Sequence, residues 1–188
     1  MYLAQPGASI LAIDATTGDE IWNYRRNISS EAAEFVGRAE TARTKNIGIY
    51  DDMVFYPAPD GYLVALDVRD GRVRWETEVF APETNTQHTG GVLVDDGKVL
   101  TNRSCKQRIG CFISAHDAQT GEEIWSYDPL VPKSWGRKAC CDVVNRGVAV
   151  WKGSVFFASL DGRLIKLDAK TGKLIWEINT LLDRDKDY

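Results

Sequence analysis

The chain has 188 residues, of which 44% are hydrophobic and 27% are charged, and this is enough apolar sequence to build a packed core. Its formal net charge of −4 provides no basic field, which disfavours nucleic acid and anionic membrane surfaces as partners. No stretch approaches the roughly 18 apolar residues of a membrane span, and we expect no export signal, because Met1 leads directly into strand-like sequence.

One nine-residue pattern occurs four times along the sequence, with Asp first, Gly fifth and Trp last. The copies read DATTGDEIW at 14–22, DVRDGRVRW at 67–75, DAQTGEEIW at 117–125 and DAKTGKLIW at 168–176. In each copy an apolar strand leads into Asp, the Gly can take a positive φ in a tight turn, and a second strand leads to Trp. Such a two-stranded unit cannot bury its own apolar face, so its repetition indicates units that stack on one another.

Successive Trp residues of this pattern are 53, 50 and 51 positions apart. A period near 50 residues is typical of one four-stranded propeller blade, in which each Trp ring packs against the next sheet. We therefore predict an all-β fold, a β-propeller of four-stranded antiparallel blades with tryptophan-docking repeats. About four blades form one domain over residues 1–188, and the repeats end near Trp22, Trp75, Trp125 and Trp176.

The segments between the repeats alternate strands and turns in the order expected for blades. The first unit has room for only about three strands before Trp22, and residues 29–35 predict one short helical turn behind a Ser cap. The charged stretch at 183–188 falls where a further blade would begin, so both ends look cut. The remaining strands are expected at 47–50, 53–56 and 61–67, at 90–94, 98–100 and 112–117, and at 145–151, 155–157 and 161–168.

Neither histidine of the sequence indicates a catalytic or metal site. His88 lies in a polar loop and is expected to be solvated. His116 alternates into a strand just before Asp117 and is expected to be structural. No CxxC or HxxxH spacing is present, so the residues predict no metal site.

Two of the four cysteines, Cys140 and Cys141, are adjacent in the sequence. Neighbouring Cα atoms lie about 3.8 Å apart, closer than the usual ~4.4–6.8 Å of a disulfide, so a bridge between them forms a strained ring. Such a bridge would act as a rigid surface or redox element, whereas two reduced thiols on opposite faces of a strand are the alternative. Cys105 and Cys111 either bridge their own loop or are free.

The segment CCDVVNRG at 140–147, followed by LDGRL at 160–164 and the repeat at 168–176, resembles the pyrroloquinoline quinone (PQQ)-dependent alcohol dehydrogenases. The resemblance implies an eight-bladed propeller, of which this chain would supply about half. It also implies oxidation of a small alcohol by PQQ, transfer of the electrons to a cytochrome c or a quinone, and a periplasmic location. This location agrees with a disulfide between the adjacent cysteines, because disulfides persist only in an oxidising compartment.

The resemblance also assigns the cofactor-binding residues. It implies that a disulfide between Cys140 and Cys141 stacks on one face of the quinone and that Val144 lines the same pocket. Arg146 would pair with cofactor oxygens, because a guanidinium suits a carboxylate or quinone oxygen by charge and geometry. Thr89 and Ser104 align loosely with positions that offer hydroxyl groups to the cofactor.

The sequence departs from this family where the metal and the base are concerned. The family's calcium-binding Glu lies where this chain has Cys105, Lys106 and Gln107, so no carboxylate is present there. The other calcium ligands and the catalytic Asp lie in later blades, so no residue here is assigned a catalytic or metal role. Two alternatives remain open: a noncatalytic PQQ-like propeller used as a binding or assembly scaffold, and a half-propeller that forms a homodimer.

Overall fold

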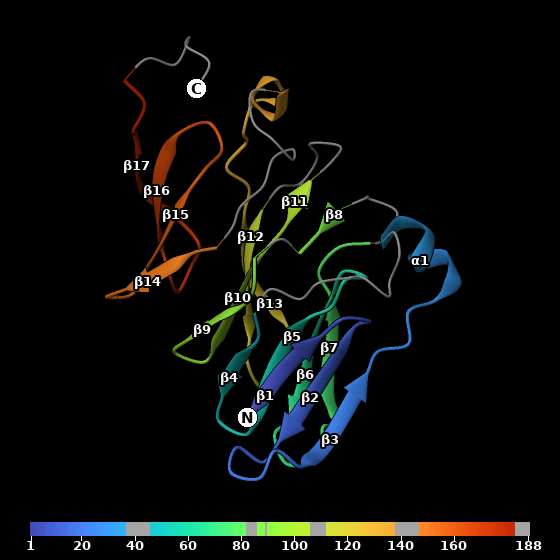
Figure 1. Cartoon of the computed structure of the whole chain (residues 1–188). Coiled ribbons are helices and arrows are strands. Elements are labelled where there is room, and N and C mark those ends of the chain that lie inside the picture. The colour runs from blue at the N-terminus through green and yellow to red at the C-terminus, as the bar shows by residue number, and fades with distance from the viewer. Residues whose placement is uncertain (37–45, 82–85, 89, 106–111, 138–146, 183–188) are drawn as a thin grey trace.

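The computed structural model describes residues 1–36, 46–81, 86–88, 90–105, 112–137 and 147–182. In this part of the chain, four antiparallel sheets of three or four strands form the blades, which follow one another in chain order (Figure 1). The all-β prediction is confirmed, and so is the three-stranded first unit. The strands of the four blades are β1 (Tyr2–Gln5), β2 (Ser9–Ile13) and β3 (Glu20–Arg25); β4 (Gly48–Tyr50), β5 (Met53–Pro57), β6 (Tyr62–Asp67) and β7 (Val73–Glu78); β9 (Leu93–Asp95), β10 (Lys98–Asn102), β12 (Ile113–Asp117) and β13 (Glu123–Tyr127); and β14 (Ala149–Trp151), β15 (Ser154–Ala158), β16 (Arg163–Asp168) and β17 (Leu174–Asn179).

Short elements connect these blades. Helix α1 (Ser30–Val36) follows the first blade, and the Ser29 hydroxyl accepts the N–H of Ala32 at 3.1 Å, which is the predicted Ser cap. Strands β8 (Thr86–Gln87) and β11 (Ser104–Cys105) form a two-stranded ribbon beside the third blade, and a 3₁₀ helix, η3, spans Lys133–Arg137. In the described part of the chain, no helix is long and apolar enough to cross a membrane.

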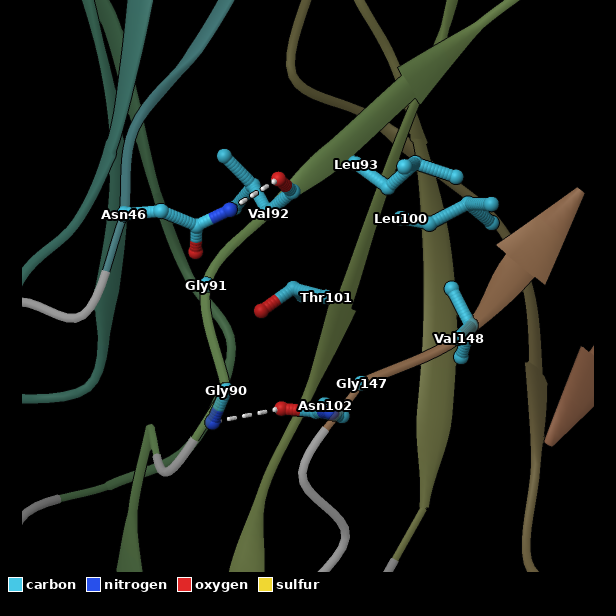
Figure 2. A pocket seen from close by; sticks show the side chains of 10 residues that line it. All are labelled: Asn46, Gly90, Gly91, Val92, Leu93, Leu100, Thr101, Asn102, Gly147 and Val148. Atoms are coloured by element: carbon cyan, nitrogen blue, oxygen red, sulfur yellow. Dashed lines mark hydrogen bonds between the residues drawn. The ribbon is translucent and has the colours of Figure 1, made fainter. Parts of the chain in front are cut away.

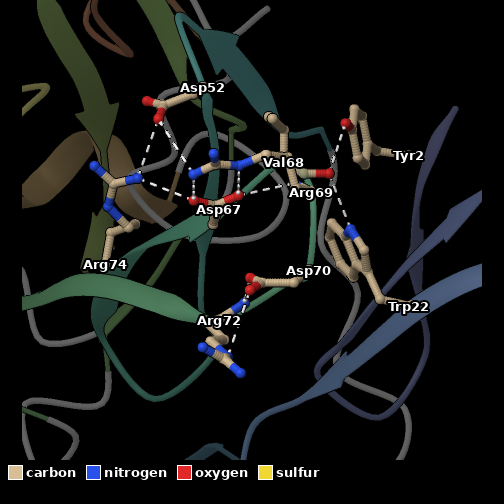
Figure 3. Close-up of polar contacts among 9 residues, drawn as sticks. All are labelled: Tyr2, Trp22, Asp52, Asp67, Val68, Arg69, Asp70, Arg72 and Arg74. Carbon is tan, nitrogen blue, oxygen red and sulfur yellow. Dashed lines mark hydrogen bonds and ion pairs between the residues drawn. The ribbon is translucent and has the colours of Figure 1, made fainter.

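The repeated Asp holds the turn between the last two strands of each blade. In the first turn the Asp14 carboxylate accepts the backbone N–H groups of Thr16 and Thr17 at 2.7 and 3.2 Å, and these bonds lower its pKa. The second turn carries Asp70 at the position of the other turns' Thr, and arginines take part instead. There the Asp67 carboxylate accepts bonds from Arg69 and Arg74, and the Arg69 guanidinium holds the pKa of Asp67 well below its usual range (Figure 3).

The repeated Trp joins each blade to the next one. The indole Nε1 of Trp22 donates to the carbonyl of Val68 at 3.0 Å, and Tyr2 donates to the same oxygen at 3.1 Å (Figure 3). Trp75 and Trp125 repeat this bond at 3.0 Å, to the carbonyls of the residues that follow the next repeat's Asp. The tryptophan-docking role predicted from the sequence is therefore confirmed at three blade junctions.

Each docked ring lies against the Gly of the next turn. A Cβ atom added to Gly71 would lie 2.6 Å from Cε3 of Trp22, and Gly172 has the same relation to Trp125, at 2.6 Å from Cδ2. These glycines also have φ values of +71° and +68°, which residues with a side chain rarely adopt. Both reasons require Gly at this position of the repeat.

The hydrophobic core is divided into three clusters, one between each pair of consecutive blades. Between the third and fourth blades, for example, Ile113 and Trp125 pack against Phe157, Ile165 and Leu167. Burying a side chain of this size contributes roughly 1.5–3 kcal/mol, so blade stacking is the main stabilising term of the fold. A blade that lies between two others buries both faces, whereas the first and fourth blades each bury one.

The short first strands of the blades begin later than the sequence predicted. Strand β9 starts at Leu93 rather than at residue 90, and β14 starts at Ala149 rather than at residue 145. The predicted apolar runs therefore include residues that precede the strands. Strands β4 and β9 lie next to each other (Figure 1). Residues just before β4, β9 and β14, the first strands of the second, third and fourth blades, contribute to the site described below.

Candidate functional site

A pocket of about 400 Å³ lies where the chain enters the first strands of the second, third and fourth blades (Figure 2). Its size is within the range of roughly 300–1,000 Å³ that is usual for small-molecule sites. Three separate blades contribute to it, so its shape depends on how the blades stack. The lining residues are Asn46, Gly90, Gly91, Val92, Leu93, Leu100, Thr101, Asn102, Gly147 and Val148.

Hydrogen bonds and close contacts that involve two asparagines and two glycines hold the segments around the pocket together. Asn46 of the second blade donates to the carbonyl of Val92 in the third blade at 3.3 Å, and Asn102 accepts the N–H of Gly90 at 3.1 Å (Figure 2). A Cβ atom at Gly91 would lie 0.7 Å from Oδ1 of Asn46, and one at Gly90 would lie 2.7 Å from the Asn102 amide. Only glycine therefore allows both amide groups to approach the backbone this closely.

The chemical character of the lining is neutral and amphipathic. Val92, Leu93, Leu100 and Val148 provide apolar walls, while the amides, the Thr101 hydroxyl and the glycine backbone provide hydrogen-bonding groups. No titratable side chain occurs among these described lining residues. The described lining can therefore orient a polar ligand by hydrogen bonds, and it supplies no acid, base or cation of its own.

His88 lies behind the pocket wall rather than in solvent, so the prediction of a solvated loop residue was wrong. Its Nδ1 is 3.1 Å from Oγ1 of Thr101 and 3.4 Å from the carbonyl oxygen of Asn102, and its ring lies 4.8 Å from that of Phe80. Burial lowers the pKa of His88 to about 4, so the ring is neutral at pH 7. Its proximity to Thr101 couples the loop at 86–88 to the pocket wall.

Arg103, which directly follows the pocket residue Asn102, stacks on aromatic rings. Its Cζ lies 3.2 Å from the centre of the Phe112 ring and 5.7 Å from that of Phe80. Burial lowers the pKa of this guanidinium to about 10, which leaves it charged at neutral pH. Neither Arg103 nor the pocket asparagines were singled out from the sequence, because their roles depend on contacts between segments that are far apart along the chain.

His116 confirms its predicted structural role. The ring is 1% exposed in β12, with Nε2 3.0 Å from the Ser114 hydroxyl and Nδ1 3.1 Å from the Gly121 carbonyl oxygen. Both ring nitrogens are therefore used within the third blade.

Most residues predicted to bind the cofactor lie outside the described residues, namely Thr89, Cys140, Cys141, Val144 and Arg146. The backbone of Ser104 is placed in β11, opposite Gln87 of β8. The described neighbours of these positions nevertheless line the pocket: Gly90 directly follows Thr89, and Gly147 directly follows Arg146. In the sequence, the predicted cofactor segments are therefore directly followed by residues that line the pocket.

The described residues do not fit a calcium site. They contain no group of three or more His, Cys, Asp or Glu side chains that could hold a metal ion. Calcium prefers six to eight oxygen ligands, usually with several carboxylates. No step of the chemistry is therefore assigned to calcium on the basis of these residues.

Two family models match the sequence. The model described as outer membrane protein assembly factor BamB matches residues 1–114, and the model described as glucose/ethanol/alcohol dehydrogenase, beta-propeller domain, matches residues 91–178. The two matches overlap in the third blade. Together they cover all four repeats.

Curated relatives are alcohol dehydrogenases. A quinohemoprotein alcohol dehydrogenase from Comamonas testosteroni is 41% identical over 189 aligned positions, which cover 93% of this chain and 25% of the relative. The 1-butanol dehydrogenase (cytochrome c) from Thauera butanivorans is 59% identical over 76 residues, 40% of this chain and 11% of the relative. The dehydrogenase subunit of an alcohol dehydrogenase (quinone) from Gluconacetobacter polyoxogenes is 48% identical over 99 residues, 53% of this chain and 13% of the relative. The chain thus spans a quarter or less of the length of these relatives.

Solved structures confirm the fold. The quinohemoprotein alcohol dehydrogenase from Comamonas testosteroni superposes with a TM-score of 0.74 at 22% identity, over 95% of this chain and 33% of that structure. BamB from Moraxella catarrhalis superposes with a TM-score of 0.62 at 21% identity, over 94% of this chain and 44% of that structure. At these identities the likeness shows a shared blade arrangement.

Proposed function

Because the chain belongs to the PQQ-dependent alcohol dehydrogenase family and spans part of the length of its members, we propose that it forms part of the PQQ site of an alcohol-oxidising quinoprotein. The observation that carries this proposal is the pocket that lies where the chain enters the first strand of each of three consecutive blades. Its described lining continues directly from Thr89 and from the CCDVVNR segment at 140–146. Those are the segments to which the family resemblance assigns the cofactor.

The described lining suits a flat, polar, multi-ring ligand. In the proposed complex the Asn46 and Asn102 amides and the Thr101 hydroxyl orient the ligand, and Val92 and Val148 exclude water from its faces. Arg146 supplies the positive charge for the cofactor's carboxylates, and a Cys140–Cys141 disulfide supplies a rigid stacking surface. PQQ, when bound, would accept the hydride of the alcohol.

The chain's own residues would bind and orient the cofactor, while the base and the metal lie elsewhere. No residue of this chain is assigned as the catalytic base, and calcium, if it is used, would be held by carboxylates outside this chain. We propose a small alcohol as the substrate, a cytochrome c or a quinone as the electron acceptor, and the periplasm as the location. The names of the relatives support the two classes of acceptor.

A second function, a noncatalytic propeller that serves as a binding or assembly scaffold, is supported by the match of residues 1–114 to the BamB model. Such a scaffold would need neither the pocket nor adjacent cysteines. The two functions therefore differ in one measurable property, the affinity for PQQ.

The test is PQQ binding in the presence of calcium, measured by fluorescence quenching and calorimetry. The wild type is compared with the Cys140→Ser/Cys141→Ser variant and with Cys105→Ser/Cys111→Ser, a matched control with the same chemistry outside the proposed stacking pair. We expect saturable binding that only the Cys140/Cys141 variant loses. Absence of binding to the folded wild type at high micromolar PQQ would favour the scaffold function instead.

A further inference from the structure

The side-chain amide of Asn46, in the pocket lining, has one fixed orientation. Its nitrogen, Nδ2, donates to the backbone carbonyl of Val92 at 3.3 Å (Figure 2). Because a carbonyl oxygen only accepts hydrogen bonds, the amide nitrogen must face Val92 and the amide oxygen, Oδ1, must face the other way. This bond between the second and third blades therefore decides which atom of the Asn46 amide remains for other contacts.

Oδ1 of Asn46 lies beside the backbone of Gly91, at the pocket wall. A Cβ atom added to Gly91 would lie 0.7 Å from Oδ1, so the oxygen occupies the space that a side chain would fill. Figure 2 shows this oxygen directed away from Val92, towards Gly91. Asn46 is exposed, and among the described residues no N–H or O–H group donates to its Oδ1. The atom is thus a hydrogen-bond acceptor that is held at a defined place in the pocket lining.

The other polar side chains of the described lining already have partners inside the protein. Oδ1 of Asn102 accepts the N–H of Gly90 at 3.1 Å, and Oγ1 of Thr101 is 3.1 Å from Nδ1 of His88. A ligand that covered Oδ1 of Asn46 without offering it a hydrogen would leave a buried acceptor unpaired, which costs free energy. The pocket therefore favours a ligand that carries an N–H or O–H group at this point.

PQQ has a single group that can satisfy this oxygen. At neutral pH its ionised carboxylates, its quinone carbonyls and its pyridine nitrogen all accept hydrogen bonds, and the pyrrole N–H is the donor of the oxidised cofactor. We propose that Oδ1 of Asn46 accepts the pyrrole N–H of PQQ, so that Asn46 orients the cofactor and selects for a free pyrrole N–H. This inference rests on the proposed function, because it requires PQQ to occupy the pocket.

A neutral amide suits this contact better than a carboxylate. An aspartate at position 46 would also accept an N–H, but its negative charge would repel the carboxylates of PQQ. It would also lack the N–H group that bonds to Val92, so two acceptor oxygens would face each other across the blade junction. The asparagine therefore supplies an acceptor without adding negative charge to a site that binds an anion.

The experiment compares PQQ with a derivative that is methylated at the pyrrole nitrogen, by titration calorimetry in the presence of calcium. Methylation removes the N–H group and leaves the carboxylates and the quinone unchanged. The proteins are the wild type, Asn46→Ala and the control Asn179→Ala. Asn179 is exposed in β17, outside the described pocket lining, and its amide is likewise bonded to the backbone, at the N–H of Leu181. Circular dichroism verifies that each variant is folded.

The methylated derivative separates a contact with the cofactor from a purely structural role of Asn46. Asn46→Ala also removes the bond to Val92, so either role predicts a weaker affinity of this variant for PQQ. A structural role lowers the affinity for both ligands by the same factor. A direct contact changes the ratio of the two affinities, because the N–H group and its acceptor are coupled.

We expect the wild type and Asn179→Ala to bind PQQ roughly tenfold or more tightly than the methylated derivative, and Asn46→Ala to lose most of this preference. A wild type that binds both ligands equally overturns the inference, and so does a preference that is undiminished in Asn46→Ala. Both of these outcomes include binding of PQQ and leave the proposed function unaffected. A wild type that does not bind PQQ at all contradicts the proposed function and this inference together.

A second measurement needs no variant and decides the case if Asn46→Ala does not fold. In the wild-type complex we expect a nuclear Overhauser effect between the pyrrole proton of PQQ and the side-chain amide protons of Asn46. A pyrrole proton that is observed in the complex but shows no such effect overturns the inference.

Discussion

The indole N–H of Trp125 donates a 3.0 Å hydrogen bond to the carbonyl oxygen of Ala169 in the following blade. The same ring lies against Gly172, so one side chain supplies both a polar and an apolar contact across the blade junction. Trp22 and Trp75 make the same bond at their junctions. The relative positions of the blades, and hence the shape of the pocket between them, depend on these three residues.

Substitutions at Trp125 separate the two contributions. Trp125→Phe keeps an aromatic ring and loses the bond to Ala169, so we expect a loss of about 1 kcal/mol in the free energy of unfolding. Trp125→Ala also removes the buried ring, and we expect a loss of about 3–5 kcal/mol. Urea unfolding followed by circular dichroism measures both values. The exposed Trp151 is the control, since Trp151→Phe should change stability by less than about 0.5 kcal/mol.

Two glycines with nearly identical φ values allow the cost of an unfavourable backbone conformation to be measured separately from the cost of steric overlap with a packed ring. Gly172 and Gly153 have φ values of +68° and +69°, but only Gly172 has a Trp ring where a Cβ atom would lie. We expect Gly153→Ala to cost about 1 kcal/mol, because only the backbone conformation opposes it. Gly172→Ala should cost at least about 1–3 kcal/mol more, because Trp125 must move. Equal losses for the two variants in urea unfolding would contradict this account of the docking contact.

Arg26 forms a nearly buried ion pair between the first two blades. Its guanidinium lies 2.7 Å from Asp60 and 2.9 Å from Glu76, and the Arg26 and Asp60 side chains are 10% and 7% exposed. Asp60→Ala leaves the buried guanidinium without its principal partner, so we expect a loss of about 3–5 kcal/mol. Glu76→Ala removes a partner that is 47% exposed and should cost about 1 kcal/mol or less. Thermal and urea unfolding of both variants test this difference.

His88 predicts a pH dependence of stability. Because burial lowers its pKa from 6.5 to about 4, the unfolded chain binds more protons than the folded chain between these values. Stability from this residue is therefore complete above pH 7 and falls as the pH decreases towards 4, by at most about 3 kcal/mol. Urea unfolding at pH 7, 5.5 and 4 measures the slope. His88→Gln should flatten it, and an unchanged slope would show that His88 is accessible to protons in the folded state.

The repeat in the sequence was sufficient to predict the blades. The spacing of Asp, Gly and Trp reflects contacts that are local or that recur at every junction, such as the bonds of Asp14 to its own turn. The Ser29 cap of α1 was also predictable from the sequence, because it depends only on residues that are adjacent in the chain.

The pocket was less predictable, because its residues meet only after the blades stack. Nothing near Asn46 in the sequence indicates that its amide will lie against Gly91 of another blade. The polar neighbours of His88 in the sequence predicted a solvated side chain. In the structure, however, Phe80 and Thr101 contact it from outside its loop. The family resemblance implies a cofactor role for Thr89 and Arg146, which stays a prediction, and the structure places the residues that follow each of them in the pocket lining.

The central claim is that the pocket holds PQQ, and the most direct test is to fill it. Val148→Trp places a large ring in the pocket wall, whereas Val73→Trp makes the same substitution at an exposed position of β7. In equilibrium titrations with PQQ, we predict saturable binding to the wild type and to Val73→Trp, and a loss of binding in Val148→Trp. Equal binding by both folded variants would show that PQQ does not occupy this pocket.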